Sequence, residues 1–118
     1  MIFKENKPIY LQIAERLCDE IIQGCYGEES RIPSVREYSA TLEVNVNTVV
    51  RSYEYLQNAS IIYNKRGLGY FVKEGATRAI IAQRKKEFMN EELPEFLNKL
   101  KQLDIPIEEI VEKYHSME

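Results

Sequence analysis

The stretch Pro33-Ser34-Val35-Arg36-Glu37 contains a strong helix start signal. Ser34 and Glu37 have the spacing of a capping box, in which the serine hydroxyl accepts the glutamate N–H and the carboxylate reaches back. Pro33 keeps the residue before it out of the helical conformation. The sequence therefore predicts a short helix that ends near Leu42. Its predicted buried side chains are Val35, Tyr38 and Leu42.

A longer helix follows this short one after a tight turn at Glu43-Val44. Asn45 is a favoured residue for the N-cap of that helix. The apolar residues that follow have helical spacing, and they predict a buried stripe of Val49, Tyr53 and Leu56. A short helix, a turn of about three to four residues and a longer helix form the plan of a helix-turn-helix motif.

The periodicity changes after Ser60 from helical to strand-like. Residues 61–65 and 70–73 are rich in β-branched and aromatic side chains, and they flank the glycine-rich tip Arg66-Gly67-Leu68-Gly69. This pattern predicts a β-hairpin. A helix-turn-helix followed by a two-stranded hairpin is a winged helix, so the fold class is mainly α with a small β part.

Further helical patterns flank the winged helix. Residues from Pro8 onward predict a first helix that Gly24 closes, and residues 25–32 are expected to form a loop. Residues 77–103 return to helical spacing, with an expected kink at Pro94, and Pro106 starts a last short helix. We expect residues 1–75 to form the winged helix and residues 76–118 to form a two-helix segment. So short a segment cannot bury its apolar residues alone, so it must pack on the winged helix, on a second copy of the chain or on both, and we favour the second copy.

Composition excludes several classes of protein. The 118 residues carry a net charge of −3, but residues 31–73 hold six basic and three acidic residues between acidic flanks. His115 is the single histidine and lies near the C-terminus, so neither a histidine-based metal site nor a catalytic triad is expected. Cys18 and Cys25 are too few for a disulfide scaffold and predict reduced, partly buried thiols. No signal peptide or membrane span is evident, so a soluble cytoplasmic protein without cofactor and without enzymatic activity is expected.

Three segments together carry a resemblance to a known family. They are Ile32-Pro-Ser-Val-Arg-Glu-Tyr, Val44-Asn-Val-Asn-Thr-Val-Val-Arg-Ser-Tyr and Lys65-Arg-Gly-Leu-Gly-Tyr-Phe-Val, and Pro8-Ile-Tyr-Leu-Gln-Ile adds a matching first helix. Over residues 8–73 the chain resembles the GntR family of bacterial transcriptional regulators, and its short tail looks like that of the YtrA subfamily. The resemblance implies a homodimeric repressor that binds double-stranded DNA at a palindromic operator. It also implies a regulated operon that is often related to a transporter.

The resemblance also implies which residues contact DNA. Arg36 is expected to reach a major-groove base, because an arginine fork fits the O6 and N7 atoms of guanine. Asn45, Asn47 and Thr48 are expected to approach phosphate or adenine, and Arg51 a phosphate. Ser34 is expected to offer its N–H or hydroxyl to phosphate. Ser34 and Asn45 have the alternative role of plain helix caps, and Tyr53 is expected in the core rather than at phosphate. Lys65, Arg66, Gly67 and Gly69 are expected to bring the hairpin tip into a minor groove.

Two departures from the family pattern bear on function. Val46 and Val50 stand where many relatives have basic residues, so the base reading of those relatives is not carried over. Ser60 stands where relatives commonly have a glycine that ends the helix, and a side chain there costs free energy in a left-handed conformation. The two valines favour the alternative function, a winged helix that docks a protein partner. Nothing in the sequence indicates an effector ligand.

Overall fold

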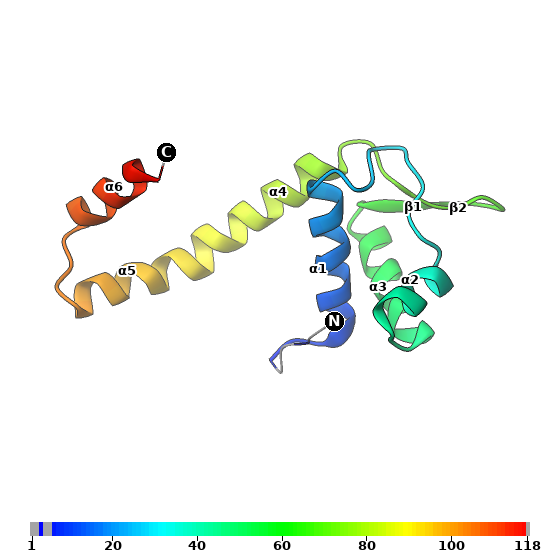
Figure 1. Cartoon of the computed structure of the whole chain (residues 1–118), viewed down its shortest axis with the longest axis horizontal. Coiled ribbons are helices and arrows are strands. Elements are labelled where there is room, and N and C mark those ends of the chain that lie inside the picture. The colour runs from blue at the N-terminus through cyan, green and yellow to red at the C-terminus, as the bar shows by residue number, and fades with distance from the viewer. Residues whose placement is uncertain (1–2, 4–5, 118) are drawn as a thin grey trace. The chain divides into compact units, whose positions relative to one another are not determined.

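The computed structural model describes residue 3 and residues 6–117, and it confirms a mainly helical winged helix-turn-helix with further helices at the C-terminus (Figure 1). The chain divides into two compact units, Met1–Ile81 and Ala82–Glu118. The elements in chain order are α1 (Ile9–Ile22), α2 (Val35–Leu42), α3 (Val46–Asn58), β1 (Ile62–Lys65), β2 (Gly69–Val72), α4 (Ala76–Glu87), the π-helical segment η1 (Phe88–Glu92), α5 (Leu93–Gln102) and α6 (Ile107–Ser116).

The core of the first unit lies among α1, α2, α3 and the hairpin. The predicted stripe of α3 is confirmed, since Val49, Tyr53 and Leu56 are buried together with residues of α1 such as Ile13 and Leu17. Burying one such large apolar side chain contributes roughly 1.5–3 kcal/mol, so this cluster is the main stabilising feature of the unit. Tyr38 and Leu42 of α2 are buried as predicted, whereas Val35 is only half-buried and packs on the margin of the cluster.

Local signals end the helices where the sequence indicates. Gly24 follows α1 with φ 87°, the left-handed conformation that glycine adopts most readily. Ser60 follows α3 with φ 61°, and the Ile61 N–H donates to the Leu56 carbonyl at 2.9 Å in the usual helix-ending pattern. Ser60 therefore adopts the left-handed conformation in spite of its side chain. A non-glycine residue in this conformation is strained by roughly 1–2 kcal/mol.

The hairpin is antiparallel, with Ile62 opposite Val72 and Lys65 opposite Gly69. Part of the predicted loop at residues 25–32 lies alongside β2 instead, and Arg31 forms a bridge with Phe71. The Val72 N–H donates to the Ser30 carbonyl at 2.9 Å, and the Ile32 N–H donates to the Tyr70 carbonyl at 3.0 Å. A two-stranded sheet leaves the outer N–H and C=O groups of β2 unpaired, and this segment satisfies them.

The long helical stretch after the hairpin begins in the first unit. Ala76 and Ile80 of α4 belong to the core described above. Further along, the chain accommodates Pro94 through η1, where the Leu93 N–H donates to the Phe88 carbonyl five residues back. Pro94 therefore lies in the first turn of α5, where its missing N–H is tolerated. The irregular part of the helix, η1, thus lies before Pro94 in the chain.

The second unit ends in α5 and α6, joined by a turn in which Asp104 has φ 53° and the Ile105 N–H donates to the Leu100 carbonyl at 2.9 Å. Among the residues described in this unit, Leu100 alone is buried. Its exposed large apolar side chains are Phe88, Met89, Phe96, Leu97, Leu103, Ile107, Val111, Tyr114 and Met117.

The structure also bears on the expectations for the two cysteines and for membrane-spanning helices. Cys18 is buried and Cys25 is exposed, and the two cysteines are not joined in a disulfide, so the prediction of burial holds for the first and is wrong for the second. None of the described helices combines the length and the apolar character that crossing a bilayer requires.

Candidate nucleic-acid interface

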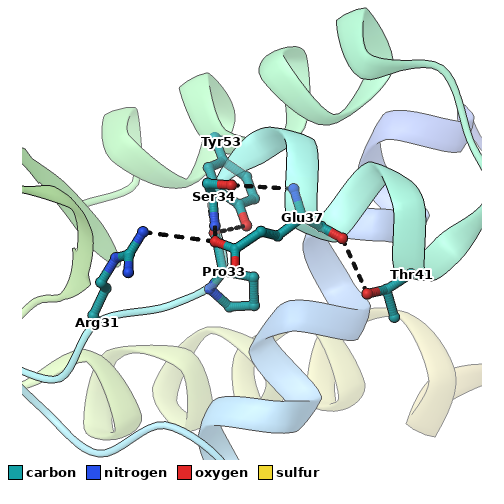
Figure 2. Close-up of polar contacts among 6 residues, drawn as sticks. All are labelled: Arg31, Pro33, Ser34, Glu37, Thr41 and Tyr53. Atoms are coloured by element: carbon teal, nitrogen blue, oxygen red, sulfur yellow. Dashed lines mark hydrogen bonds and ion pairs between the residues drawn. The ribbon is translucent and has the colours of Figure 1, made fainter.

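The start of α2 is fixed by the predicted capping box (Figure 2). The Glu37 N–H donates to Ser34 Oγ at 3.1 Å, and the Ser34 N–H donates to Glu37 Oε1 at 2.9 Å. The bond from the Ser34 N–H, with smaller help from the serine hydroxyl bond and the charge of Arg31, holds the pKa of the Glu37 carboxyl below its usual range. The Ser34 side chain is thus engaged in capping.

Arg36 lies one residue before Glu37 and is exposed, as its expected contact with a DNA base requires. Within the described part of the chain the Arg36 side chain makes no hydrogen bond or ion pair. Its guanidinium has five N–H donors in a planar fork, all of them available to an incoming acceptor. The placement leaves Arg36 free to bind a base edge or a phosphate.

Three polar residues lie at the start of α3. Asn45 is the N-cap, and its Oδ1 accepts the Asn47 N–H at 2.8 Å, so the capping role is realised. The Asn47 side chain is exposed and Thr48 is half-buried. The backbone N–H groups of this first turn and the positive end of the helix dipole favour an anion.

The two valines of α3 differ in exposure. Val46 is 38% exposed, whereas Val50 is half-buried. Val46 is therefore the more accessible of the two apolar side chains.

Arg51 is directed by a contact with α1. Its guanidinium carbon lies 4.0 Å above the ring centre of Tyr10, and the edge of Tyr55 packs on Tyr10 with the ring centres 6.3 Å apart. Such a cation–π contact contributes roughly 0.5–1 kcal/mol at an exposed site and restricts the arginine. Arg51 remains exposed, so its N–H donors are still available.

The hairpin tip carries two positive charges. Lys65 Nζ lies 4.6 Å from the ring centre of Phe71, and Arg66 is exposed with no polar partner among the described residues. Gly67 and Gly69 have φ 80° and 111°, so both glycines are required by the backbone of the turn. Figure 1 shows the hairpin extending beyond the helices of the first unit.

One side chain that the sequence analysis assigned no role lies between α2 and the hairpin. Arg31 Nη2 lies 3.6 Å from Glu37 Oε1, and a Cβ added to Gly69 would lie 3.1 Å from Arg31 Nε. Arg31 belongs to the basic segment 31–73 and lies three residues before the Ser34 cap. This position near the start of α2 is the sequence signal that marks it as a candidate for DNA contact. The structure thus brings the start of α2 and the base of the hairpin together through Arg31.

Tyr53 lies in the core and does not reach an interface. It is fully buried, and its hydroxyl donates to the Pro33 carbonyl at 2.7 Å (Figure 2). Burial, reinforced by the charges of nearby tyrosines and glutamates, raises its pKa above the usual range. The expectation of core packing for this residue is confirmed.

Among the residues that the structure describes, no three histidine, cysteine or carboxylate side chains lie close enough together to hold a metal ion. Four exposed basic side chains, Arg36, Arg51, Lys65 and Arg66, are donors, which suit an anionic partner.

Comparisons with known proteins agree with this geometry. The sequence model of bacterial regulatory proteins of the gntR family matches residues 9–72. The HTH-type transcriptional regulator YhcF of Bacillus subtilis is 34% identical over 110 residues, which are 93% of this chain and 89% of that protein. The HTH-type transcriptional repressor YtrA of the same organism is 29% identical over 80% of this chain and 72% of its own length.

A solved structure is similar over almost the whole chain. The crystal structure of a transcriptional regulator of the GntR family from Bacteroides thetaiotaomicron matches with a TM-score of 0.83 and 54% identity. The match covers 92% of this chain and 96% of that one, so the similarity extends beyond the winged helix into the C-terminal helices.

Proposed function

This chain belongs to the GntR family of DNA-binding transcriptional regulators, and we propose that it acts as a homodimeric repressor at a palindromic operator on double-stranded DNA. Regulation of transcription, rather than catalysis, is the activity of this family. The observation that carries the proposal is Arg36, an exposed arginine at the start of α2 with no partner among the described residues. Its fork is available for guanine, the commonest specific arginine contact in a major groove.

The other contacts follow from the same arrangement. The first turn of α3 offers the backbone N–H groups and the side chains of Asn47 and Thr48 to phosphate or adenine. Asn45 contributes mainly through its cap, because its side-chain oxygen already accepts an N–H. Arg51 contacts backbone phosphate from its position above Tyr10. Lys65 and Arg66 carry the hairpin charge toward an adjacent minor groove, where the negative potential attracts arginine.

The dimer and the repressor role are supported by different observations. The second unit leaves large apolar side chains such as Phe96, Leu97 and Val111 exposed, and a second copy of the chain would cover them. Two copies related by a two-fold axis recognise a palindrome. YtrA is named a transcriptional repressor, and this chain is similar to it over most of its length. A bacterial operon related to a transporter is the proposed target, and the cytoplasm is the proposed location because the chromosome lies there.

The decisive experiment measures binding of the full chain to the DNA upstream of its own gene, with a scrambled duplex of the same composition as the control. We expect tighter binding to the natural sequence and an affinity that falls steeply with salt. Arg36→Ala should cost roughly 1–3 kcal/mol on the operator and relax base preference in each half-site. Lys65→Ala should weaken all sequences alike. Equal affinity for natural and scrambled DNA would contradict the proposal.

A second candidate function is docking of a protein partner through α3. The exposed Val46 is the observation that favours it, because this side chain offers no charge or hydrogen bond to a phosphate but can pack on an apolar protein surface. Val46→Lys separates the two functions. The added charge should strengthen DNA binding through phosphate attraction, whereas it should abolish an apolar protein contact.

A further inference from the structure

Arg31 occupies the junction between the two parts of the proposed DNA interface. Its backbone pairs with Phe71 of β2, which fixes the residue at the base of the hairpin. Its guanidinium lies against Gly69 on one side and 3.6 Å from the Glu37 carboxylate at the start of α2 on the other. Figure 2 shows the side chain extending toward Glu37. The position is set by three separate contacts, so it is a defined location rather than an arbitrary surface conformation.

A DNA strand bound by this protein would pass close to Arg31, and this inference rests on the proposed DNA-binding function. A major groove and the neighbouring minor groove of one duplex are separated by a single sugar–phosphate strand. If α2 and α3 enter the major groove and the hairpin tip enters the adjacent minor groove, that strand must cross the surface between them. Arg31 is the positive side chain that the structure places between the start of α2 and the hairpin base.

We infer that Arg31 binds a backbone phosphate on the strand between the two grooves and that Glu37 holds its guanidinium in place until DNA arrives. In the free protein Arg31 pairs with Glu37 across the surface, with both side chains more than half exposed. Exposed pairs of this kind contribute little to stability, because water screens both charges. A phosphate in the field of the DNA polyanion attracts arginine more strongly, and its contact is charge-assisted on both sides.

Glu37 loses little when the phosphate takes over the guanidinium. Its Oε1 still accepts the Ser34 N–H at 2.9 Å, and that bond does not depend on Arg31. The capping box therefore persists in the DNA complex, and α2 keeps its start. The exchange changes only the partner of Arg31, from a carboxylate of its own chain to a phosphate of the DNA.

Removing the guanidinium tests the phosphate contact. Arg31→Gln keeps a polar but shorter and uncharged side chain, and Arg31→Ala removes it. For both variants we expect roughly tenfold weaker binding to operator and to scrambled DNA alike, and a salt slope shallower by about 0.9. The thermal midpoint should change little, because the ion pair that is lost is exposed.

The matched control is Arg16→Ala. Arg16 is also an exposed arginine in a weak pair, 3.8 Å from Glu20, and it lies on α1 beside the carboxylate that Tyr38 contacts. Its removal changes the net charge equally and should leave the salt slope unchanged. A salt slope that falls as much in Arg16→Ala as in Arg31→Gln would show a net-charge effect and overturn the inference.

Glu37→Gln tests the exchange. Glutamine keeps the acceptor for the Ser34 N–H, as capping boxes with glutamine do, but no longer holds the guanidinium. We expect about two- to fivefold tighter DNA binding in the wild-type background, from the loss of an exposed pair, and little gain in the Arg31→Gln background. An equal gain in both backgrounds would overturn the role of Glu37.

The two proposals fail in distinguishable ways. Wild-type protein that does not prefer its operator contradicts the proposed function. Wild-type protein that prefers its operator, with Arg31→Gln and Arg31→Ala matching it in affinity and salt slope, overturns the phosphate contact of Arg31 alone.

Discussion

The Tyr53 hydroxyl donates a hydrogen bond of 2.7 Å to the carbonyl oxygen of Pro33, and this bond joins α3 to the segment that leads into α2. The same ring packs edge-on against Tyr70 of β2, with the ring centres 5.0 Å apart. One fully buried tyrosine of α3 therefore contacts the lead-in of α2 and the hairpin. The residues proposed to contact DNA are carried by these same three elements, so their spacing depends on this ring.

We expect Tyr53→Phe to lower the free energy of unfolding by about 0.5–1.5 kcal/mol, because the Pro33 carbonyl loses its donor while the ring packing is kept. Urea denaturation measures this change. Tyr55→Phe is the control. The Tyr55 ring is half exposed and packs on Tyr10, and its hydroxyl makes no hydrogen bond to the described residues. If the two variants unfold at the same urea concentration, the bond to Pro33 contributes nothing measurable.

Ser60→Gly should stabilise the protein by about 1 kcal/mol, because glycine removes the cost of a side chain at φ 61°. The thermal midpoint would rise accordingly. Ala59→Gly is the matched control one residue earlier, where φ is −84° and glycine relieves no strain. A rise in both variants, or in neither, would contradict this account of the helix end.

Stability should fall as the pH rises above about 10. Burial, together with the hydrogen bond to Glu20, raises the pKa of Tyr38, and burial raises that of Tyr53. The unfolded chain releases these phenolic protons near pH 10, whereas the folded chain retains them. Their contribution is therefore complete below pH 10 and is lost above it, at up to about 1.4 kcal/mol per pH unit for each tyrosine.

Urea denaturation between pH 8 and 11 measures this dependence, and Tyr38→Phe should flatten it. Tyr114→Phe serves as the control, because that ring is 69% exposed. Unchanged stability across the alkaline range would show that the buried phenols ionise in the folded protein.

Deletion of residues 82–118 should give a monomer that binds operator DNA far more weakly. The deletion starts after Ile81 because Ala76 and Ile80 belong to the core of the first unit, and a cut at residue 76 would remove them. Sedimentation measures the association state. Phe96→Glu should have the same effect in the full chain, whereas Lys99→Glu, a charge change on the same helix, should leave the dimer intact. A truncated chain that stays dimeric at micromolar concentration would refute dimerisation through this segment.

Arg66→Ala should remove a preference for A·T base pairs beside each half-site, because arginine is attracted to the narrow minor groove of such sequences. Binding to operators with A·T or G·C flanks measures the preference. Gly69→Val does not test the hairpin tip, since φ 111° and the adjacent Arg31 make that change destabilise the fold. If Arg66→Ala keeps the wild-type preference, the hairpin does not read the flanks.

Several site residues could be placed from the sequence because their signals are local. The capping box of Ser34 and Glu37 and the Asn45 cap lie where the pattern indicates. A cap depends on atoms within three or four residues, and such spacing is visible along the chain. The exposure of Arg36 follows from the helical period for the same reason.

Periodicity and short-range signals in the chain predict most of the helices, the hairpin, the buried stripe of α3 and the family. The partners of Arg31 and Arg51 come instead from the tertiary packing. Arg31 meets Gly69 because residues 29–32 add to the edge of β2, and Arg51 meets Tyr10 because α3 packs on α1. These contacts join residues about 40 positions apart. No local pattern specifies them, since packing of the shared core sets which surface side chains become neighbours.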